Sequence, residues 1–200
     1  RCIGSGEDPA TAPSYCGLLQ GNLGYSTFFK APVASSLGEK LAATGWLMLA
    51  VMLVMVPTSL FLGVLSGMRE GSRTDRVLST FSIASTATPE YVSGVIFIAL
   101  LASPTIGLSP LLSGAGWIES RTLFMGTSTS AMDDITFWNF ALPVMTIALY
   151  GIGYIARMTR ASMTEVMTAQ YIRTARLKGV SFGQVVMRHA LRNALIAPFT

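Results

Sequence analysis

Residues 41–68 read LAATGWLMLAVMLVMVPTSLFLGVLSGM, a run of 28 positions without a single ionisable side chain. An α-helix needs about 20 apolar residues to cross the hydrocarbon core of a bilayer. The run is therefore long enough to form a membrane-spanning helix. Pro57 lies inside it, and neighbouring helices can satisfy the backbone carbonyl that proline leaves free, so we expect a kink rather than a break.

Two further apolar stretches follow this run. The first, 77–103, contains Pro89 and a single charged residue, Glu90, and the second covers 135–156. Of the whole chain, 51% is hydrophobic and only 12% is charged, whereas about a quarter of the residues in soluble domains are charged. We therefore predict an all-α integral membrane protein, a polytopic helical bundle with about three spans.

The expected spans divide the chain into membrane and flanking segments. We expect residues 1–40 to be extracytoplasmic and residues 41–200 to form the transmembrane domain. Residues 193–200 begin an apolar run that stops before it could cross a bilayer, so we interpret the chain as a fragment. The expected transmembrane domain consists of spans at 41–68, 77–103 and 135–156, a loop at 157–192 and the start of a further span at 193–200.

The basic residues lie mostly on one side of the expected spans. Ten of the 14 Lys and Arg residues fall in the segments 69–76 and 157–192. Loops rich in Lys and Arg stay in the cytoplasm, so we expect both segments to be cytoplasmic, and the three spans then alternate consistently. The net charge of +4 is spread among apolar spans, which argues against a nucleic-acid partner because such a partner requires a basic stripe on a soluble surface.

Residues 165–185, EVMTAQYIRTARLKGVSFGQV, predict two helices joined by a tight corner. We expect the first helix to continue to Lys178 and Gly179 to take the left-handed conformation that follows a helix end. Ser181 and Gln184 match a capping box, which predicts that a second helix starts there. A compact corner between two spans can transmit movement to the membrane helices, although any cytoplasmic loop can also fold as a helical hairpin.

Three runs in this loop resemble a known signature. They are RASMTEV at 160–166, YIRTARLKG at 171–179 and RHALRNA at 188–194, and they resemble the coupling loop of permease subunits of the dipeptide/oligopeptide/nickel class of ABC importers. Weaker similarities occur at 21–26 (GNLGYS), at 57–65 and at 88–91 (TPEY). In the wider importer superfamily this loop carries Glu-Ala-Ala, three residues and then Gly. Here Arg173, Thr174 and Ala175 occupy the three positions and Gly179 is retained.

The resemblance implies that the helix before Gly179 inserts into a cleft on a cytoplasmic ATPase subunit. It also implies a second permease subunit, an extracytoplasmic substrate-binding protein and the bacterial inner membrane as partners of the chain. Permeases of this family usually have about six spans, so one span before Arg1 and two after residue 190 would be missing here. The residues expected to couple to the ATPase are Glu165, Tyr171, Arg173, Thr174, Ala175, Lys178 and Gly179.

The sequence has no G-x-x-x-x-G-K-[ST] phosphate loop, so we expect the partner ATPase subunits to bind ATP and Mg²⁺. We expect this chain itself to be no enzyme and to carry no cofactor or metal. The expected activity is transport of peptides or a related small solute, whose selection belongs largely to the binding protein. Two alternatives are a self-contained secondary transporter, which would need more paired intramembrane charges than Glu90 alone, and a membrane scaffold protein.

Two further candidate sites follow from single residues. Glu90 is expected near mid-membrane, about 14 residues into its helix, where carboxylates are functional candidates, and we favour a residue that lines the pathway over one that binds substrate. Cys2 and Cys16 flank a loop-like stretch, and in an extracytoplasmic segment they can form a disulfide or remain two free thiols.

Overall fold

The structure is a computed structural model that describes residues 19, 21–26, 28–120, 122–124 and 135–199. Cys2 and Cys16, and with them the expected disulfide, lie outside the described residues. Among the residues described, the only strands are β1 (Tyr25–Ser26) and β2 (Ala31–Pro32), which pair antiparallel and lead directly into the first helix. The rest of the architecture is helical, as the sequence predicted.

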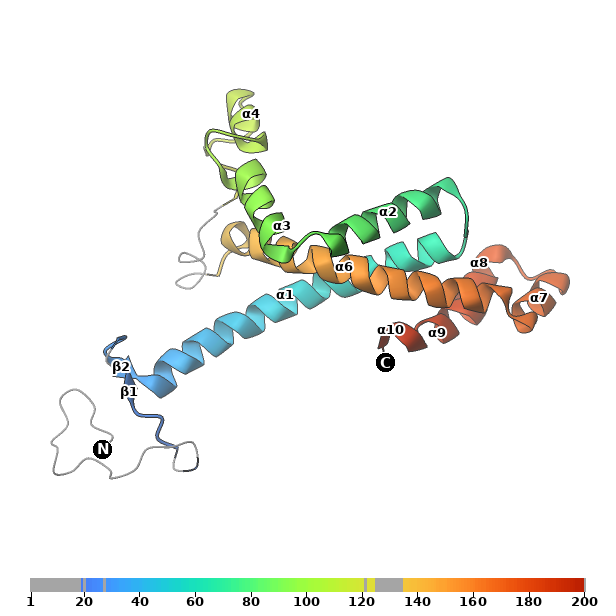
Figure 1. Cartoon of the computed structure of the whole chain (residues 1–200), viewed down its shortest axis with the longest axis horizontal. Helices are drawn as coiled ribbons and strands as arrows, with labels where there is room; N and C mark the ends of the chain where they lie inside the picture. Colours follow the sequence, from blue (N-terminus) through green and yellow to red (C-terminus); the bar gives the residue numbers. More distant parts are fainter. Residues whose placement is uncertain (1–18, 20, 27, 121, 125–134, 200) are drawn as a thin grey trace.

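Two long helices, α1 (Val33–Gly67) and α6 (Phe137–Thr168), form the centre of the molecule (Figure 1). Both are long and apolar enough to cross a membrane by length and composition, and the prediction of an all-α membrane protein is confirmed. Helix α1 continues through Pro57 and includes residues 33–40, which precede the expected span. Helix α6 extends beyond the third expected span and carries Arg157 and Arg160 in its last turns.

Helices α1 and α6 pack closely because α1 has glycine where they meet. A Cβ atom on Gly63 would lie 2.5 Å from the Cβ of Thr159, and one on Gly67 would lie 2.6 Å from the Cβ of Met163. In both pairs the α6 residue is 96 positions further along the chain, so the helices run parallel in one register. Small residues spaced by four allow this close approach between membrane helices.

The second expected span, 77–103, is bent and is not one continuous helix. Helix α2 (Arg73–Ala87) is followed by α3 (Glu90–Phe97) and the π-helical turn η2 (Ile98–Ala102), and the chain bends by 102° between α2 and α3. Thr88 has an extended ψ of 122° because it precedes Pro89, which disfavours the helical conformation of its predecessor. By length and composition the bent pair is either one broken span or a re-entrant loop.

The two parts of the bent pair have different surroundings. Helix α2 lies beside α1 and α6, whereas α3 and the short helix α4 (Leu108–Gly114) rise away from that layer (Figure 1). Gly153 allows α2 to approach α6, since a Cβ atom there would lie 2.8 Å from the carbonyl oxygen of Ser82. We call the described residues between 90 and 124 the arm.

The C-terminal helices fold back against the ends of α1 and α6 (Figure 1). The expected single helix up to Lys178 is interrupted at Ala169, whose ψ of 147° separates α6 from α7. The interruption turns the apolar face of α7 inward, so that Ile172 is 1% exposed and Ala175 is 9% exposed. The C-terminal helices are α7 (Gln170–Leu177), α8 (Phe182–Gln184), the π-helical η3 (Val185–Ala190), α9 (Leu191–Ala194) and α10 (Ile196–Phe199).

These helices share a hydrophobic cluster with the two long helices. Val64 and Met68 at the end of α1 pack against it, as do Val166 and Met167 of α6. The loop after α6 is therefore a packed helical unit built directly onto α1 and α6. The buried members of the cluster are Met163, Ile172, Ala175, Val185, Val186, Ala190 and Ala194.

Candidate functional site at the basic end of the helices

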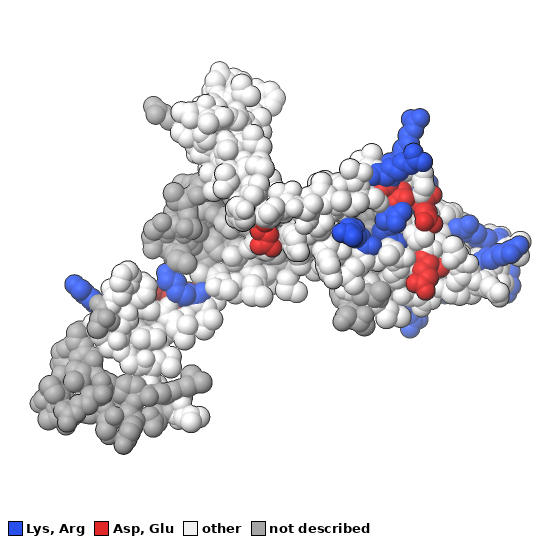
Figure 2. Space-filling model, viewed as in Figure 1, with Lys and Arg blue, Asp and Glu red and all other residues white. Residues whose placement is uncertain are grey.

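Charged side chains gather at one end of the molecule. On the face shown in Figure 2, most Lys and Arg side chains lie where α1 ends, α2 begins and α6 leads into α7. We define the basic end as the last turns of α1 and α6, the first turns of α2, and helices α7 to α9. The middle of the molecule on the same face is almost free of charge (Figure 2). This distribution agrees with the basic segments identified in the sequence.

An ion pair between α2 and α6 organises the basic end, and we call it the clamp. Arg160 donates through Nε to Oδ1 of Asp75 at 2.5 Å and through Nη2 to Oδ2 at 2.8 Å. The side chain of Asp75 is only 4% exposed and that of Arg160 is 30% exposed. Two parallel hydrogen bonds of this kind fix the geometry of the two groups as well as their charge contact.

The carboxylate of Asp75 also accepts hydrogen bonds from its other neighbours. Ser66 at the end of α1 donates to Oδ1 at 2.6 Å, the N–H of Gly71 donates to Oδ2 at 2.9 Å, and Ser79 donates to Oδ1 at 3.2 Å. Hydrogen bonds to the ionised form favour a charged carboxylate even when it is buried. One aspartate thus joins the ends of α1, α2 and α6.

The clamp was not predictable from the sequence, because Asp75 and Arg160 are 85 positions apart. The local signal at this place is Ser72, whose hydroxyl caps α2 by accepting from the N–H of Asp75 at 3.1 Å. That pattern identifies a helix start but not a partner on another helix.

The corner at Gly179 has the predicted geometry. Gly179 has a φ of +79°, its N–H donates to the carbonyl of Arg176 at 3.0 Å, and the N–H of Val180 donates to the carbonyl of Ala175 at 3.2 Å. These two bonds form a Schellman motif, which satisfies carbonyls left open at a helix end. The predicted capping box is wrong: Ser181 is at the N-cap position of α8, but its side chain makes no capping hydrogen bond.

Side chains from three segments hold the corner in place. Asn193 donates through Nδ2 to the hydroxyl oxygen of Tyr171 at 2.9 Å, which joins α9 to α7. The guanidinium carbons of Arg176 and Arg69 lie 5.6 Å and 6.0 Å from the centre of the Phe182 ring, within cation–π range. The corner is therefore fixed to the loop between α1 and α2 as well as to α9.

Six of the seven residues expected to couple to an ATPase are on the surface. Ala175 is the exception, because it is 9% exposed and belongs to the hydrophobic cluster, so it can support α7 but cannot offer a contact surface. Leu177, which the sequence analysis did not select, is 82% exposed next to the corner. The six exposed residues are Glu165, Tyr171, Arg173, Thr174, Lys178 and Gly179.

Glu90 lies at the bend between α2 and α3 rather than in the middle of a straight helix. It is the first residue of α3, directly after Pro89, and its side chain is exposed. With the residues that the structure describes, Glu90 forms no hydrogen bond or ion pair. Its carboxylate at the vertex of the bend is therefore free to contact water or a ligand.

A bundle of apolar helices with one charged, helically folded end defines a polytopic membrane protein with a structured basic loop. Residues 59–200 match the family model described as binding-protein-dependent transport system inner membrane component. The chain belongs to this family of membrane permeases, and the resemblance found in the sequence is confirmed.

The chain is similar to several bacterial permease proteins. It is 36% identical over 191 residues to the di/tripeptide transport system permease protein DppB of Pseudomonas aeruginosa, covering 92% of this chain and 56% of the relative. It is 35% identical over 179 residues to the probable peptide ABC transporter permease protein y4tP of Sinorhizobium fredii, covering 88% and 52%. For the glutathione transport system permease protein GsiC of Escherichia coli the identity is 29% over 182 residues, covering 91% and 53%. The chain spans about half the length of these relatives.

Proposed function

We propose that the chain is part of the transmembrane permease subunit of an ATP-driven importer. With a second permease subunit it forms the path for peptides or a related small solute delivered by an extracytoplasmic binding protein. The basic end, including residues 157–192, lies in the cytoplasm of the bacterial cell and docks on ATPase subunits that bind ATP and Mg²⁺. Membership of a binding-protein-dependent transport family and the similarity to peptide and glutathione transport permeases support this proposal.

The packing of the basic end is the observation that carries the proposal. A docking element can move membrane helices only if it is attached to them firmly. Helix α7 shares the hydrophobic cluster with α1 and α6, and the clamp joins both helices to α2. A push on α7 is thus transmitted to three helices through packed side chains rather than through a flexible loop.

The exposed face of the corner fits a partner surface. Leu177 is 82% exposed and has exposed basic residues, Arg176 and Lys178, on either side of it in the chain. Burial of this apolar side chain against a partner would contribute binding free energy, while the neighbouring charges would orient the partner. We assign Leu177 to the docking face together with Tyr171, Arg173, Thr174 and Lys178, and we assign Ala175 to its support.

We also propose that Glu90 lines the path for the solute. Its exposed carboxylate stands at the vertex of a 102° bend, where α3 leaves the layer of long helices. An unpaired carboxylate within a membrane segment favours a water-filled surface over lipid.

Replacement of Gly179 tests the docking role, with Gly183 as the matched control. Gly179 has a φ of +79° and open space around it, so Gly179→Val strains the backbone of the corner without a clash. Gly183 also has open space around it but no left-handed φ, so Gly183→Val leaves the corner unchanged. The full-length subunit, co-expressed with its ATPase partner, is expected to lose ATP-driven uptake and co-purification with Gly179→Val but not with Gly183→Val.

Three results would contradict the proposal. Intact assembly and intact ATP-driven uptake in Gly179→Val would remove the docking role from the corner. Uptake that continues without any ATPase subunit would favour a secondary transporter, and a full complex without any uptake would favour a scaffold protein.

A further inference from the structure

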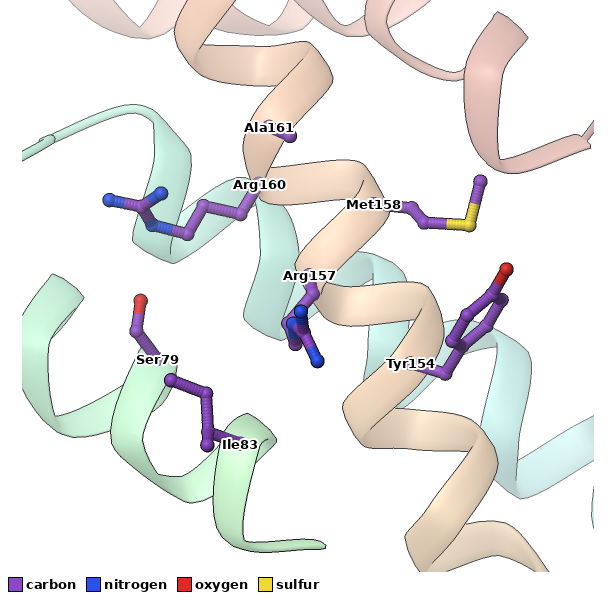
Figure 3. Close-up of a pocket in the computed structure, with 7 residues that line it drawn as sticks. All are labelled: Ser79, Ile83, Tyr154, Arg157, Met158, Arg160 and Ala161. Carbon is purple, nitrogen blue, oxygen red and sulfur yellow. The ribbon is translucent and has the colours of Figure 1, made fainter. Parts of the chain in front are cut away.

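A cleft between α2 and α6 lies next to the clamp. It has a volume of about 410 Å³ and opens to the surface. Figure 3 shows Arg157 in a central position, with Ser79 and Ile83 of α2 on one side and Tyr154 and Met158 of α6 on the other. Arg160 and Ala161 complete the lining. The cleft therefore combines a cationic group with apolar and hydroxyl-bearing side chains.

The positive charge of the cleft comes from Arg157. The guanidinium of Arg160 is bound by the carboxylate of Asp75 and is neutralised there. Arg157 donates to the hydroxyl of Thr86 at a distance of 3.4 Å, and it forms no ion pair with any carboxylate in the described part of the chain. An exposed guanidinium with several free N–H groups is suited to bind a phosphate.

The position of Arg157 along α6 places it at the boundary of a bilayer. The twenty residues from Phe137 to Ala156 contain no Asp, Glu, Lys, Arg or His, and Arg157 follows them directly. Twenty helical residues span about 30 Å, which is the thickness of the hydrocarbon core. The Cα of Arg157 therefore lies at the end of a segment long enough to cross the hydrocarbon core, and its guanidinium extends back to Thr86, which packs beside Gly153.

The walls of the cleft continue toward the apolar middle of the molecule. Ile83 is 56% exposed and Tyr154 is 54% exposed, and Phe81 on α2 is 43% exposed. A ligand that matches both the cationic and the apolar part of the cleft has a phosphate at one end and a hydrocarbon chain at the other. Basic pockets between membrane helices bind lipid headgroups for this reason.

We propose that the cleft binds an anionic phospholipid of the leaflet at the basic end, with the phosphate on Arg157 and an acyl chain along Ile83 and Tyr154. The lipid neutralises a guanidinium that would otherwise lie uncompensated at the edge of the hydrocarbon. The site depends on the membrane location of the chain and not on ATPase docking, so it goes beyond the proposed function.

Native mass spectrometry of the full-length subunit in mild detergent tests this site. The wild-type protein is titrated with dioleoylphosphatidylglycerol and with dioleoylphosphatidylcholine, and we expect a preference of about fivefold for the anionic lipid. Arg157→Gln should abolish the preference and Arg157→Lys should retain part of it. Arg188→Gln, which removes an exposed arginine of η3 outside the cleft, should leave the preference unchanged.

Several outcomes would overturn the proposal. Equal binding of the two lipids by the wild-type protein would contradict it, and so would an unchanged preference in Arg157→Gln. Loss of the preference in excess inorganic phosphate would identify a soluble anion as the ligand. Ile83→Cys, in a full-length subunit whose other cysteines are replaced by serine, should react with a lipid-partitioning maleimide in native membranes. Protection of that cysteine would mean that a protein segment covers the cleft.

Discussion

The basic end carries most of the charged side chains and the arm is largely apolar (Figure 2), yet the basic end is the more tightly packed of the two. At the basic end seven side chains form a buried hydrophobic cluster, and the clamp ties three helices together. In the described part of the arm only Ser93 and Ser109 are buried, and none of its apolar side chains is. Apolar composition alone therefore does not determine how tightly the helices pack. At the basic end, close contacts at glycines and one shared carboxylate hold three helices together. We therefore expect substitutions at the basic end to affect the whole molecule and those in the arm to act locally.

The largest effect is expected from adding one methyl group where α1 meets α6. In Gly67→Ala the new Cβ would lie 2.6 Å from the Cβ of Met163 and 2.7 Å from the carbonyl oxygen of Arg160, so the helices must separate. Overpacking of this kind costs about 3 kcal/mol. Thermal unfolding of the full-length protein in detergent measures the loss.

Gly94→Ala in the arm is the matched control for that substitution. Its Cβ would lie 3.3 Å from Cγ2 of Thr146, a contact that a side chain can relieve. Because alanine favours a helix over glycine by about 1 kcal/mol, this change should be neutral or stabilising. Equal losses in the two variants would mean that the packing of the two regions does not differ.

The next effect is expected from removing the charge of the clamp. Asp75→Asn leaves Arg160 without its ion-pair partner and weakens the bonds from Ser66 and Gly71. Hydrogen bonds to charged groups contribute about 2 kcal/mol, and we expect a loss of that size because Arg160 keeps some contact with solvent. Unfolding of the double variant Asp75→Asn/Arg160→Gln should show a smaller loss than the sum of the two single variants. Additive losses would show that the two side chains are not coupled.

A smaller and local effect is expected at Ser109 in the arm. Its hydroxyl donates to the carbonyl of Leu101 at 2.6 Å and accepts from the N–H of Leu123 at 3.1 Å, which holds α4 against η2. Ser109→Ala should cost about 1 kcal/mol in local stability. Hydrogen exchange should become faster in residues 98–124 while the melting temperature stays the same. Ser113→Ala on the same helix is the control, and a fall in melting temperature with Ser109→Ala would contradict the independence of the arm.

The smallest effect on stability is expected at the vertex of the bend. Glu90 is exposed and makes no contact of hydrogen-bond type with the described residues, so Glu90→Gln should change the free energy of unfolding by less than about 0.5 kcal/mol. Uptake of solute should fall if the carboxylate lines the path. Uptake unchanged from wild type would remove that role from its charge.

Features set by neighbouring residues were predictable from the sequence, and those set by tertiary contacts were not. The long uncharged runs predicted α1 and α6, and a glycine after a basic helix end predicted the corner at Gly179. Thr88 before Pro89 was a local signal for the bend, but the apolar run around it suggested a straight helix. Nothing local predicted the break at Ala169, since alanine favours helices and the packing of Ile172 decides the geometry.

The candidate site was predictable to a similar extent. The signature around Gly179 located the exposed corner, whereas the buried position of Ala175 and the exposure of Leu177 depend on how α7 rotates onto the cluster. The clamp depends on two residues that only the packing of α2 on α6 brings together.

The glycine contacts between α1 and α6 also determine how the two helices can slide. Gly63 and Gly67 accept Thr159 and Met163 in one register, so a slip of one residue would place a side chain of α6 against bulkier positions of α1. The next register that fits small residues requires a shift of four residues, about 6 Å along the axis. The two helices can therefore pack this closely only in discrete registers. We therefore expect a force applied to α7 to tilt α1 and α6 together instead of sliding one along the other.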